Sequence, residues 1–469
     1  MVPDGRRDGS LDPGRHATDD GAVPAAPTDR VTDPTAAAAS PADGGSIWRE
    51  PAFVRLWAAA SISYVGSFVT RTALPLTAIY LLDAGPLEIS ALRSFELVGW
   101  LLVGLVAGAW VDRLRRRPVM IAADLGRAVL LGSIPVAAIG GVLGLPQLIV
   151  VAFLAAMLST FFNSASTAYL PTIVARARLL AANSALSATG SVAEFTGFAI
   201  SGFLIQVLTA PIAIAIDAVS FVVSALLLRT IHRSEPPPPA VADREPVLDE
   251  IREGIRVVVH DPILRALALA HAGTHVLWGV FGAAYLLFAT EDLQLGPAAI
   301  GIIAALGGIG SFIGAATAGR FVGRFGVGPT MVIGLTGFAV GNALIPLAPS
   351  GAILLGAAFL VAQQLIGDAL ATVYDVVEQS VTQSIVHDRI LGRVNATIET
   401  LTTLLALAGS IIGGIVGELF GLRVAFGVGI VGAVAAVVFV WFSPVRSLRS
   451  MPEPIAATIP RPEDPPLTE

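Results

Sequence analysis

Long apolar stretches, broken by short polar turns, run along the chain from about Phe53 to Phe442. Each stretch has room for the roughly 20 apolar residues that a helix needs to cross a bilayer. The pattern predicts an all-α integral membrane protein with twelve transmembrane helices, at approximately 53–82, 88–111, 118–140, 147–170, 184–208, 211–231, 263–289, 297–319, 329–348, 351–376, 395–418 and 422–442.

The turns between these helices alternate in charge. The chain has no lysine, and its arginines collect in every second turn, whereas the intervening turns hold no arginine except Arg423 in the last one. Positive charge stays on the cytoplasmic side during insertion, so the alternation predicts an even number of helices in the inner (plasma) membrane, with both termini cytoplasmic. Arginine in place of lysine, with abundant alanine, glycine and proline, is typical of a GC-rich bacterial genome.

Composition changes sharply at three places and predicts the domain organisation. Residues 1–48 and 444–469 are rich in small and polar residues without apolar periodicity, which predicts disordered cytoplasmic tails. Between the two six-helix groups, 49–232 and 263–443, we expect a cytoplasmic linker at 233–262. Within it, apolar residues recur at helical spacing and predict an amphipathic helix on the inner membrane surface, through Leu248, Ile251, Ile255 and Val259.

The two six-helix groups resemble each other in sequence. With an offset of 211 residues, Pro118 and Met120 match Pro329 and Met331, and one residue further a spaced set of an asparagine and two glycines recurs. This predicts two pseudo-symmetric bundles, an arrangement that many secondary transporters use around a central site. Glycine permits close approach of membrane helices, so we expect helix-packing contacts at the matched glycines, Gly197 and Gly202 with Gly409 and Gly414.

Composition also excludes several classes of chemistry. Without cysteine there are no disulfides and no thiolate sites, and without lysine there is no Walker A loop for ATP. The histidines are not arranged with acids as a catalytic site, and the net charge of −6 is spread over tails and loops. We therefore expect no enzyme activity, no cofactor, no metal site and no nucleic-acid partner.

Residues 108–117 read GAWVDRLRRR and follow the second predicted helix. This segment resembles the loop signature of the major facilitator superfamily, in which a glycine precedes an Asp-Arg pair and further basic residues. The resemblance implies gating roles for Gly108, Asp112, Arg113, Arg116 and Arg117. It also implies that Asp112 contacts the N-terminus of helix 11, near Arg393, and latches the outward-open state. The alternative is a solvated basic loop that only sets topology; the copy in the second half, GRFVGRFG, has Gly323 in place of the acid.

A closer resemblance, over roughly residues 50–445, is to the transmembrane secretion effectors of this superfamily, which include enterobactin-exporter-like and macrolide-efflux-like proteins. It is carried by ADLGRA, LLAANSALSA, IDAVSF, EGIRVVVHDPILRAL and ILGRVNATIET. It implies a major facilitator fold, and efflux of an antibiotic, siderophore or secondary metabolite in exchange for protons. We expect a monomer in the lipid bilayer. Two departures weaken the inference of antiport: Gly197-Phe198 replaces the Gly-Pro pair of helix 5, and helix 4 lacks an arginine.

Two other functions remain open from the sequence. One is an importer or facilitator of the same fold. The other is a membrane scaffold or sensor that transports nothing.

Ionisable residues inside apolar helices are costly and mark candidate functional sites. Arg71 and Glu96 lie about 16 Å and about 12 Å from the outer ends of their helices, a similar depth that predicts an ion pair between them. Glu194 lies near the middle of helix 5. A carboxyl group in apolar surroundings favours its neutral form, which suits a proton carrier. A purely structural role is the alternative for all three.

Further candidates lie in the second half of the chain. His271, His275 and Trp278 share one face of helix 7, which predicts a titrating or substrate-stacking surface; packed core histidines and a metal site without a third ligand are the alternatives. Asp368 and Glu399 lie in the inner halves of helices 10 and 11, where either can face a cavity. In the first half, we read three further charges as structural: Asp124, Arg127 and Asp217.

Overall fold

The computed structural model describes residues 46–111, 114–233, 235, 247–386 and 388–452. These residues form α-helices joined by short turns and by short 3-10 and π segments, with no strand among them. The elements in chain order are η2 (Ile47–Arg49), α1 (Pro51–Leu82), α2 (Pro86–Val111), α3 (Arg116–Ile139), α4 (Leu145–Ile173), η3 (Arg176–Arg178), α5 (Leu179–Leu208), α6 (Ala210–Arg229), α7 (Val247–His260), α8 (Pro262–Leu287), η4 (Phe288–Asp292), α9 (Pro297–Phe325), α10 (Val327–Leu347), α11 (Ile353–Gln363), η5 (Gln364–Asp368), α12 (Ala369–Ile385), α13 (Asp388–Phe420), α14 (Leu422–Trp441) and η6 (Pro444–Ser447).

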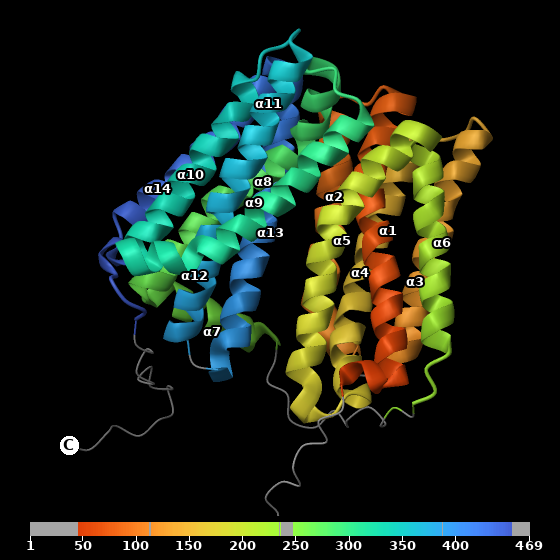
Figure 1. Ribbon diagram of the computed structural model, residues 1–469, viewed down its shortest axis with the longest axis horizontal. Helices are drawn as coiled ribbons and strands as arrows, with labels where there is room; N and C mark the ends of the chain where they lie inside the picture. The colour runs from red at the N-terminus through yellow and green to blue at the C-terminus, as the bar shows by residue number, and fades with distance from the viewer. Residues whose placement is uncertain (1–45, 112–113, 234, 236–246, 387, 453–469) are drawn as a thin grey trace, which may run out of the picture. The chain divides into compact units, whose positions relative to one another are not determined.

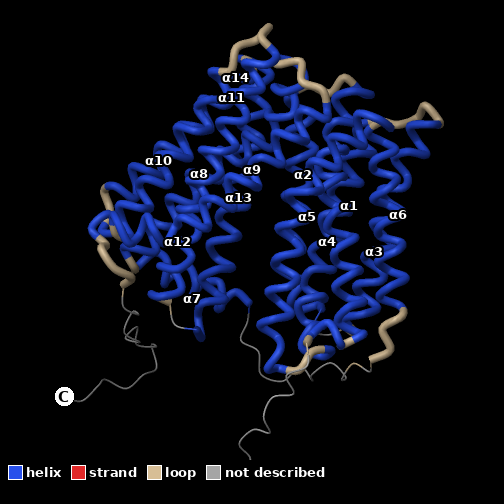
Figure 2. Tube along the Cα trace, viewed as in Figure 1, coloured by secondary structure: helices blue, strands red, loops and turns tan. Residues whose placement is uncertain are grey.

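Twelve of the described segments have the length of a membrane span, which confirms the predicted helix number. Eleven are both long and apolar enough to cross a bilayer, counting α11, η5 and α12 as one continuous span of 33 residues. The twelfth is α2, with 26 residues. Figures 1 and 2 show these helices running side by side, with the short helix α7 at the end where the two halves of the chain are joined. We call this the linker end and the opposite end the far end.

The two halves use the same packing pairs. In the first, α1 packs on α5 and α6, α2 on α4, and α3 on α6. In the second, α8 packs on α13 and α14, α9 on α12, and α10 on α14. Each pair in one half has its counterpart in the other, so the fold consists of two pseudo-symmetric six-helix bundles, as the internal repeat predicts. We call them the N bundle (α1–α6) and the C bundle (α8–α14).

The amphipathic helix of the linker, α7, packs on the C bundle and leaves part of the predicted apolar stripe exposed. Val257 and Val258 are buried, whereas Ile255 and Val259 of the predicted apolar stripe are about half exposed. Gly254 lies against α13, where an added Cβ would be 2.3 Å from the Thr397 hydroxyl. The side chains of Leu248 and Ile251 lie outside the described residues. The predicted contact of this stripe with the inner membrane surface stays a prediction.

Short parts of the predicted tails are structured. Ile47 of the N-terminal tail is buried in η2, and Val445 of the C-terminal tail is buried in η6. The carbonyl of Leu448 accepts a hydrogen bond from the Gly328 amide at 2.8 Å. These apolar side chains anchor the chain at the bundle edges, so both structured ends extend a few residues beyond the predicted boundaries. The remainder of both tails, residues 1–45 and 453–469, lies outside the described residues.

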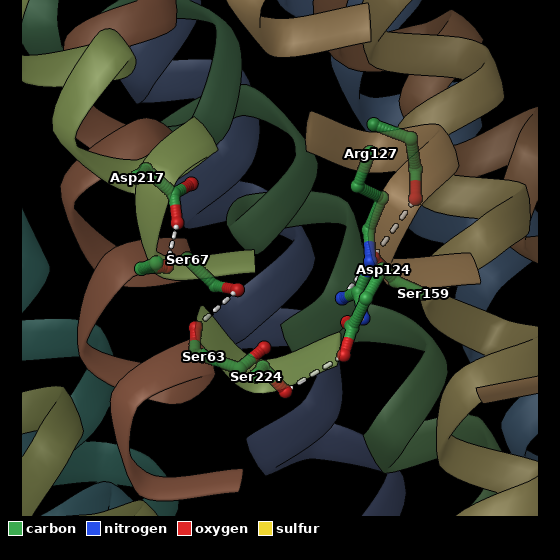
Figure 3. A network of polar contacts seen from close by, with 9 residues as sticks. Ser63, Ser67, Asp124, Arg127, Ser159, Asp217 and Ser224 are labelled. Carbon is green, nitrogen blue, oxygen red and sulfur yellow. Dashed lines mark hydrogen bonds and ion pairs between the residues drawn. The ribbon is translucent and has the colours of Figure 1, made fainter. Parts of the chain in front are cut away.

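A buried polar network joins α3, α4 and α6 of the N bundle (Figure 3). Arg127 forms an ion pair with Asp124, one turn earlier in α3, and both side chains are almost fully buried. The Ser224 hydroxyl donates to the other Asp124 oxygen at 2.7 Å, and Arg127 donates to Ser159 at 3.3 Å. The guanidinium also lies 4.1 Å from the centre of the Phe221 ring. Both charges here have a partner, which supports the structural role predicted from sequence.

Asp217, whose partner could not be deduced from sequence, connects α6 to α1. Its carboxylate accepts hydrogen bonds from the hydroxyls of Thr70 and, at 2.9 Å, Ser220. Gly66 leaves room for it, because a Cβ there would lie 2.1 Å from an Asp217 oxygen. The side chain is fully buried. It thus holds two helices together through neutral donors and not through a cation.

We expect Arg127→Met to destabilise the protein by about 3–5 kcal/mol, because it leaves the Asp124 carboxylate buried without its cation. The measurement is the free energy of unfolding of the purified protein in a detergent titration. Arg320→Met, which removes an exposed arginine, is the control and should change little. The double variant Asp124→Leu/Arg127→Met removes both charges and should recover most of the loss. Equal stability of Arg127→Met and Arg320→Met would contradict a stabilising network.

One glycine of the first matched pair holds helices together within each bundle. A Cβ at Gly197 in α5 would lie 2.6 Å from Phe68 of α1. At the matched position in α13, a Cβ on Gly409 would lie 2.2 Å from the Val276 carbonyl oxygen of α8. Backbones approach this closely only where a side chain is missing. The two matched glycines therefore perform the same packing role in the two bundles.

The second matched pair of glycines joins the two bundles at the far end. A Cβ at Gly202 in α5 would lie 2.4 Å from the Pro297 carbonyl oxygen and 2.8 Å from Gly301 Cα in α9. On the opposite side of the molecule, a Cβ at Gly414 in α13 would lie 2.2 Å from Ser90 Cβ of α2. We call these contacts the α5–α9 seam and the α2–α13 seam.

Hydroxyl groups complete the α2–α13 seam. Ser90 donates to the Ser410 carbonyl at 2.7 Å, and the Ser94 and Ser410 hydroxyls lie 3.3 Å apart. All three serines are buried. The two bundles are therefore in direct backbone contact near the far end, and a cavity can open only towards the linker end.

We expect Gly202→Leu to force the α5–α9 seam apart, because its side chain would occupy the position of the Pro297 carbonyl. Spin labels on cysteines introduced at the exposed positions Val207 in α5 and Ile302 in α9 report the separation across the seam. Electron–electron resonance should show a shift to longer distances. Gly190→Leu, on the same helix but with open space around its Cβ, is the matched control. Identical distance distributions for Gly202→Leu and Gly190→Leu would show that the seam does not depend on the glycine.

Candidate functional site

A large cavity lies between the two bundles, below the seams. It has a volume of about 1220 Å³ and is lined by residues of both bundles. Apolar and aromatic side chains form most of its wall, among them Phe68, Trp100, Phe195, Trp278 and Phe281. A cavity of this size and lining can hold a small amphipathic molecule. We call it the central cavity.

Charged residues of the N bundle cluster on one part of this wall. Arg93 and Glu96, one turn apart in α2, form an ion pair of 2.6 Å. Arg71 of α1 is exposed to the cavity and interacts electrostatically with Arg93, Glu96 and Glu194. The predicted Arg71–Glu96 ion pair is therefore wrong, since Glu96 takes its partner from its own helix. Counting residues from the helix ends gave Arg71 and Glu96 a similar depth, but it could not show that Arg93 lies closer to Glu96.

Glu194 of α5 and Asp368 of the C bundle face the central cavity from opposite bundles. Glu194 is exposed to the cavity, and its carboxylate interacts electrostatically both with Arg71 and with Asp368. Asp368 lies against α9, where a Cβ on Gly307 would be 2.5 Å from one carboxylate oxygen. The other oxygen is buried and has no hydrogen-bond partner among the described residues. Two carboxylates thus approach each other across the cavity.

Asp368 is the last residue of a π-helical turn, η5, that interrupts the span between α11 and α12. Such single turns insert an extra residue into a helix and occur often at functional sites. Gly341 of α10 allows the turn to pack closely, because a Cβ there would lie 2.6 Å from Gly367 Cα. The π turn changes the direction of the side chains that follow it relative to those that precede it.

The predicted histidine face of α8 lines a second cavity, of about 470 Å³, inside the C bundle. The rings of His271 and His275 lie 5.4 Å apart, and Trp278 lies 6.0 Å from Phe338. His271 Nδ1 is 3.8 Å from a carboxylate oxygen of Glu378 in α12. We call this the side cavity. His275, Trp278 and Glu399 line both cavities, so the two are adjacent.

Sequence reasoning missed two carboxylates of the side cavity, Asp375 and Glu378 of α12. Glu378 is buried, and it accepts a hydrogen bond from the Thr382 hydroxyl at 2.9 Å. Both acids lie in the linker-end half of the span that contains Asp368, in a segment that reads as polar helix. Because these acids are far from the histidines in the sequence, their spacing could not show that the two groups line the same cavity. Among the described residues, no group of three histidines or acids could hold a metal ion.

The predicted gating motif is only partly described. Asp112 and Arg113 lie outside the described residues, and Gly108 lies in the last turn of α2. The amides of Arg116 and Arg117, at the start of α3, donate to the two carboxylate oxygens of Glu235 at 2.7 and 2.9 Å. The Arg117 guanidinium donates to two carbonyls at the end of α6. These arginines therefore join α3 to the segment that leaves the N bundle.

The residue expected to lie near Asp112, at the start of helix 11, has a partner in the linker. Arg393 of α13 forms an ion pair with Glu253 of α7. This ion pair links α7 to the C bundle at the linker end. The predicted contact between Asp112 and helix 11 involves residues outside the described part and stays a prediction.

Sequence comparison places most of the chain in one family. The profile of the Major Facilitator Superfamily matches residues 56–278 and 267–466. An uncharacterized MFS-type transporter, YfiS of Bacillus subtilis, is 27% identical over 392 residues, which cover 79% of this chain and 88% of that protein. The multidrug efflux pump Tap of Mycolicibacterium fortuitum is 27% identical over 354 residues, which cover 73% of this chain and 84% of the pump.

Solved structures show the same fold. A bacterial homologue of the iron transporter ferroportin, in an inward-facing state, superposes with a TM-score of 0.67 at 18% identity, over 85% of this chain and 99% of that one. The nucleoside transporter NupG superposes with a TM-score of 0.66 at 14% identity, over 83% of this chain and 97% of that one. At these identities the likeness concerns the fold alone. The chain belongs to the major facilitator superfamily, and is a membrane transporter and not an enzyme.

Proposed function

We propose that this protein exports a small amphipathic compound, such as an antibiotic, siderophore or secondary metabolite, in exchange for protons. The observation that carries the proposal is the pair of carboxylates, Glu194 and Asp368, that face one cavity from opposite bundles. Similarity to a multidrug efflux pump supports the direction of transport. The largely apolar wall of the central cavity, with its aromatic side chains, supports an amphipathic substrate.

The geometry of the carboxylate pair connects proton binding to bundle position. Glu194 belongs to the N bundle and Asp368 to the C bundle, so repulsion between them depends on how far apart the bundles are. A proton on either group removes the repulsion and allows the carboxylates to approach. Arg71 interacts electrostatically with Glu194 on the same part of the wall. A cation or a hydrogen-bond donor of the substrate would bind the carboxylate pair in place of the proton.

Because the seams at the far end are closed, the structure corresponds to the inward-open state of this mechanism. With the linker end in the cytoplasm, the central cavity is open to the inside and receives substrate from there. Separation of the α5–α9 and α2–α13 seams, with closure at the linker end, would expose the same cavity to the outside. The bundles rock around a fixed site, as in other transporters built from repeats.

The orientation can be tested because the chain has no native cysteine. Single cysteines at Val142, exposed in the α3–α4 turn of the far end, and at Ala177, exposed at the linker end, provide the two reporters. An impermeant maleimide added to intact cells should label position 142 and leave position 177 unlabelled. Permeabilised cells, in which both cysteines react, are the control. Labelling of position 177 from outside would reverse the proposed orientation.

Coupling through the carboxylate pair predicts the behaviour of Glu194→Gln. The variant resembles the protonated state permanently, so proton-driven export should fall to the level of cells without the protein while substrate binding persists. A panel of antibiotics in a host that lacks its own pumps identifies an exported compound. Its addition to everted vesicles should then dissipate a pH gradient with the parent protein but not with Glu194→Gln. Asp368→Asn should behave like Glu194→Gln.

The control for these measurements is Glu291→Gln, which removes an exposed carboxylate at the far end. It should export and dissipate the gradient like the parent. Normal proton exchange by both Glu194→Gln and Asp368→Asn would exclude the pair from coupling. Accumulation of the compound, instead of its loss, would identify an importer of the same fold.

A further inference from the structure

The side cavity has no role in the mechanism above, although it is a built feature of the C bundle. It lies among α8, α10, α12 and α13 and has a volume of about 470 Å³. It adjoins the central cavity, because Trp278, Asp375 and Glu399 line both. A molecule in the central cavity can therefore extend one end into it.

The charges around the side cavity have one sign. Asp375, Glu378 and Glu399 line it, and no arginine does so among the described residues. The arginines that line the central cavity, Arg71, Arg93 and Arg127, all belong to the N bundle. The basic groups of the side cavity are His271 and His275. Glu378, the buried one of the three, thus lacks the permanent cation that a buried carboxylate normally requires.

Unpartnered groups accompany these carboxylates. Tyr374 is 2% exposed and lines the side cavity, and its hydroxyl has no hydrogen-bond partner among the described residues. His271 Nδ1 is also buried without a hydrogen bond in the described part of the chain. Buried polar atoms in native proteins almost always have partners. Polar side chains that are themselves buried thus form part of the wall beside these acids.

Aromatic rings form part of the remaining wall, together with neutral polar and aliphatic side chains. Trp278 and Phe338 lie 6.0 Å apart, and the Tyr374 ring lies 5.9 Å from His271. The face of an aromatic ring attracts a cation, and indole does so most strongly. Carboxylates that accept N–H groups, together with aromatic faces, make up a site for an organic ammonium ion.

We propose that the side cavity binds a protonated amine carried by the transported compound. The Glu378 and Asp375 carboxylates accept hydrogen bonds from the ammonium group. Tyr374 lies in the same wall. The rings of Trp278 and Phe338 cover the apolar part of the molecule next to the ammonium group. The proposal rests on the proposed function only in assigning the amine to a transported compound. The substrate class that follows is an amphipathic amine, with an apolar or aromatic body in the central cavity.

A matched pair of probes tests the charge. The amine is dansylcadaverine, and the neutral analogue is the same dansylamide with a terminal hydroxyl in place of the amino group. Binding to purified full-length protein in lipid nanodiscs is followed by energy transfer from tryptophan to dansyl, without a proton gradient. The amine should bind at least about tenfold more tightly than the alcohol, the ratio expected for one charge-assisted contact.

Variants assign the preference to the side cavity. Glu378→Gln and Asp375→Asn should each lower amine affinity by about tenfold and leave alcohol affinity unchanged. Glu291→Gln, remote from both cavities, should bind both probes like the parent. Trp278→Phe keeps a ring but should remove much of the energy transfer, which places the probe beside Trp278, where the two cavities meet. If Glu378→Gln does not fold, Asp375→Asn gives the answer, since its side chain is exposed to the cavity.

Two outcomes would overturn the proposal. One is equal affinity of the parent protein for amine and alcohol, including no binding of either. The other is an amine preference that survives in both Glu378→Gln and Asp375→Asn. Failure of the coupling mechanism is a separate result: normal proton exchange by Glu194→Gln and Asp368→Asn would exclude the carboxylate pair from coupling and leave the amine preference untouched, because binding is measured without a gradient.

Discussion

The close approach of helix backbones at glycines, four of them in matched positions of the repeat, is the constraint on which this structure depends. In a bilayer the lipid tails are as apolar as the side chains, so helices associate through contact and not through the hydrophobic effect. Gly197 and Gly409 provide that contact within the bundles, and Gly202 and Gly414 provide it between them. The pairs occupy equivalent positions of a repeated sequence. The equivalent helices α5 and α13 therefore each pack within their own bundle and against the other bundle.

The contacts within and between bundles differ in what surrounds them. Within the N bundle, the Asp124–Arg127 pair and Asp217 tie α3 and α1 to α6 through fully buried partners. Between the bundles, the polar contacts of the α2–α13 seam come from three serine hydroxyls, and glycines and apolar side chains make the other contacts of the seams. Serines can exchange their partners for water when a seam opens, whereas a buried carboxylate cannot lose its cation without a large cost. The bundles are therefore suited to move as rigid bodies.

Much of this arrangement could be predicted from sequence, and the failures share a cause. Hydrophobic length gave the twelve helices, and the repeat gave the packing glycines. Partners distant in sequence were not accessible: Asp217 binds Thr70, 147 residues away, and Glu96 prefers Arg93 to Arg71. The acids of α12 were missed for a further reason. The π turn η5 adds a residue to the span, which rotates later side chains by about 100° relative to a regular helix, and hydrophobic periodicity does not reveal such a turn.

That same turn places two proposed events on one helix. Asp368 ends η5 and faces Glu194 across the central cavity, while Asp375 and Glu378 follow on α12 and face the side cavity. An ammonium group bound by Glu378 would contact the same helical segment that carries Asp368, the carboxylate proposed to gain and lose a proton. The positive charge would also stabilise ionised Asp368 through the intervening low-dielectric wall. Substrate binding would thus favour proton release by electrostatics alone, the order of events that exchange of a cation for a proton requires.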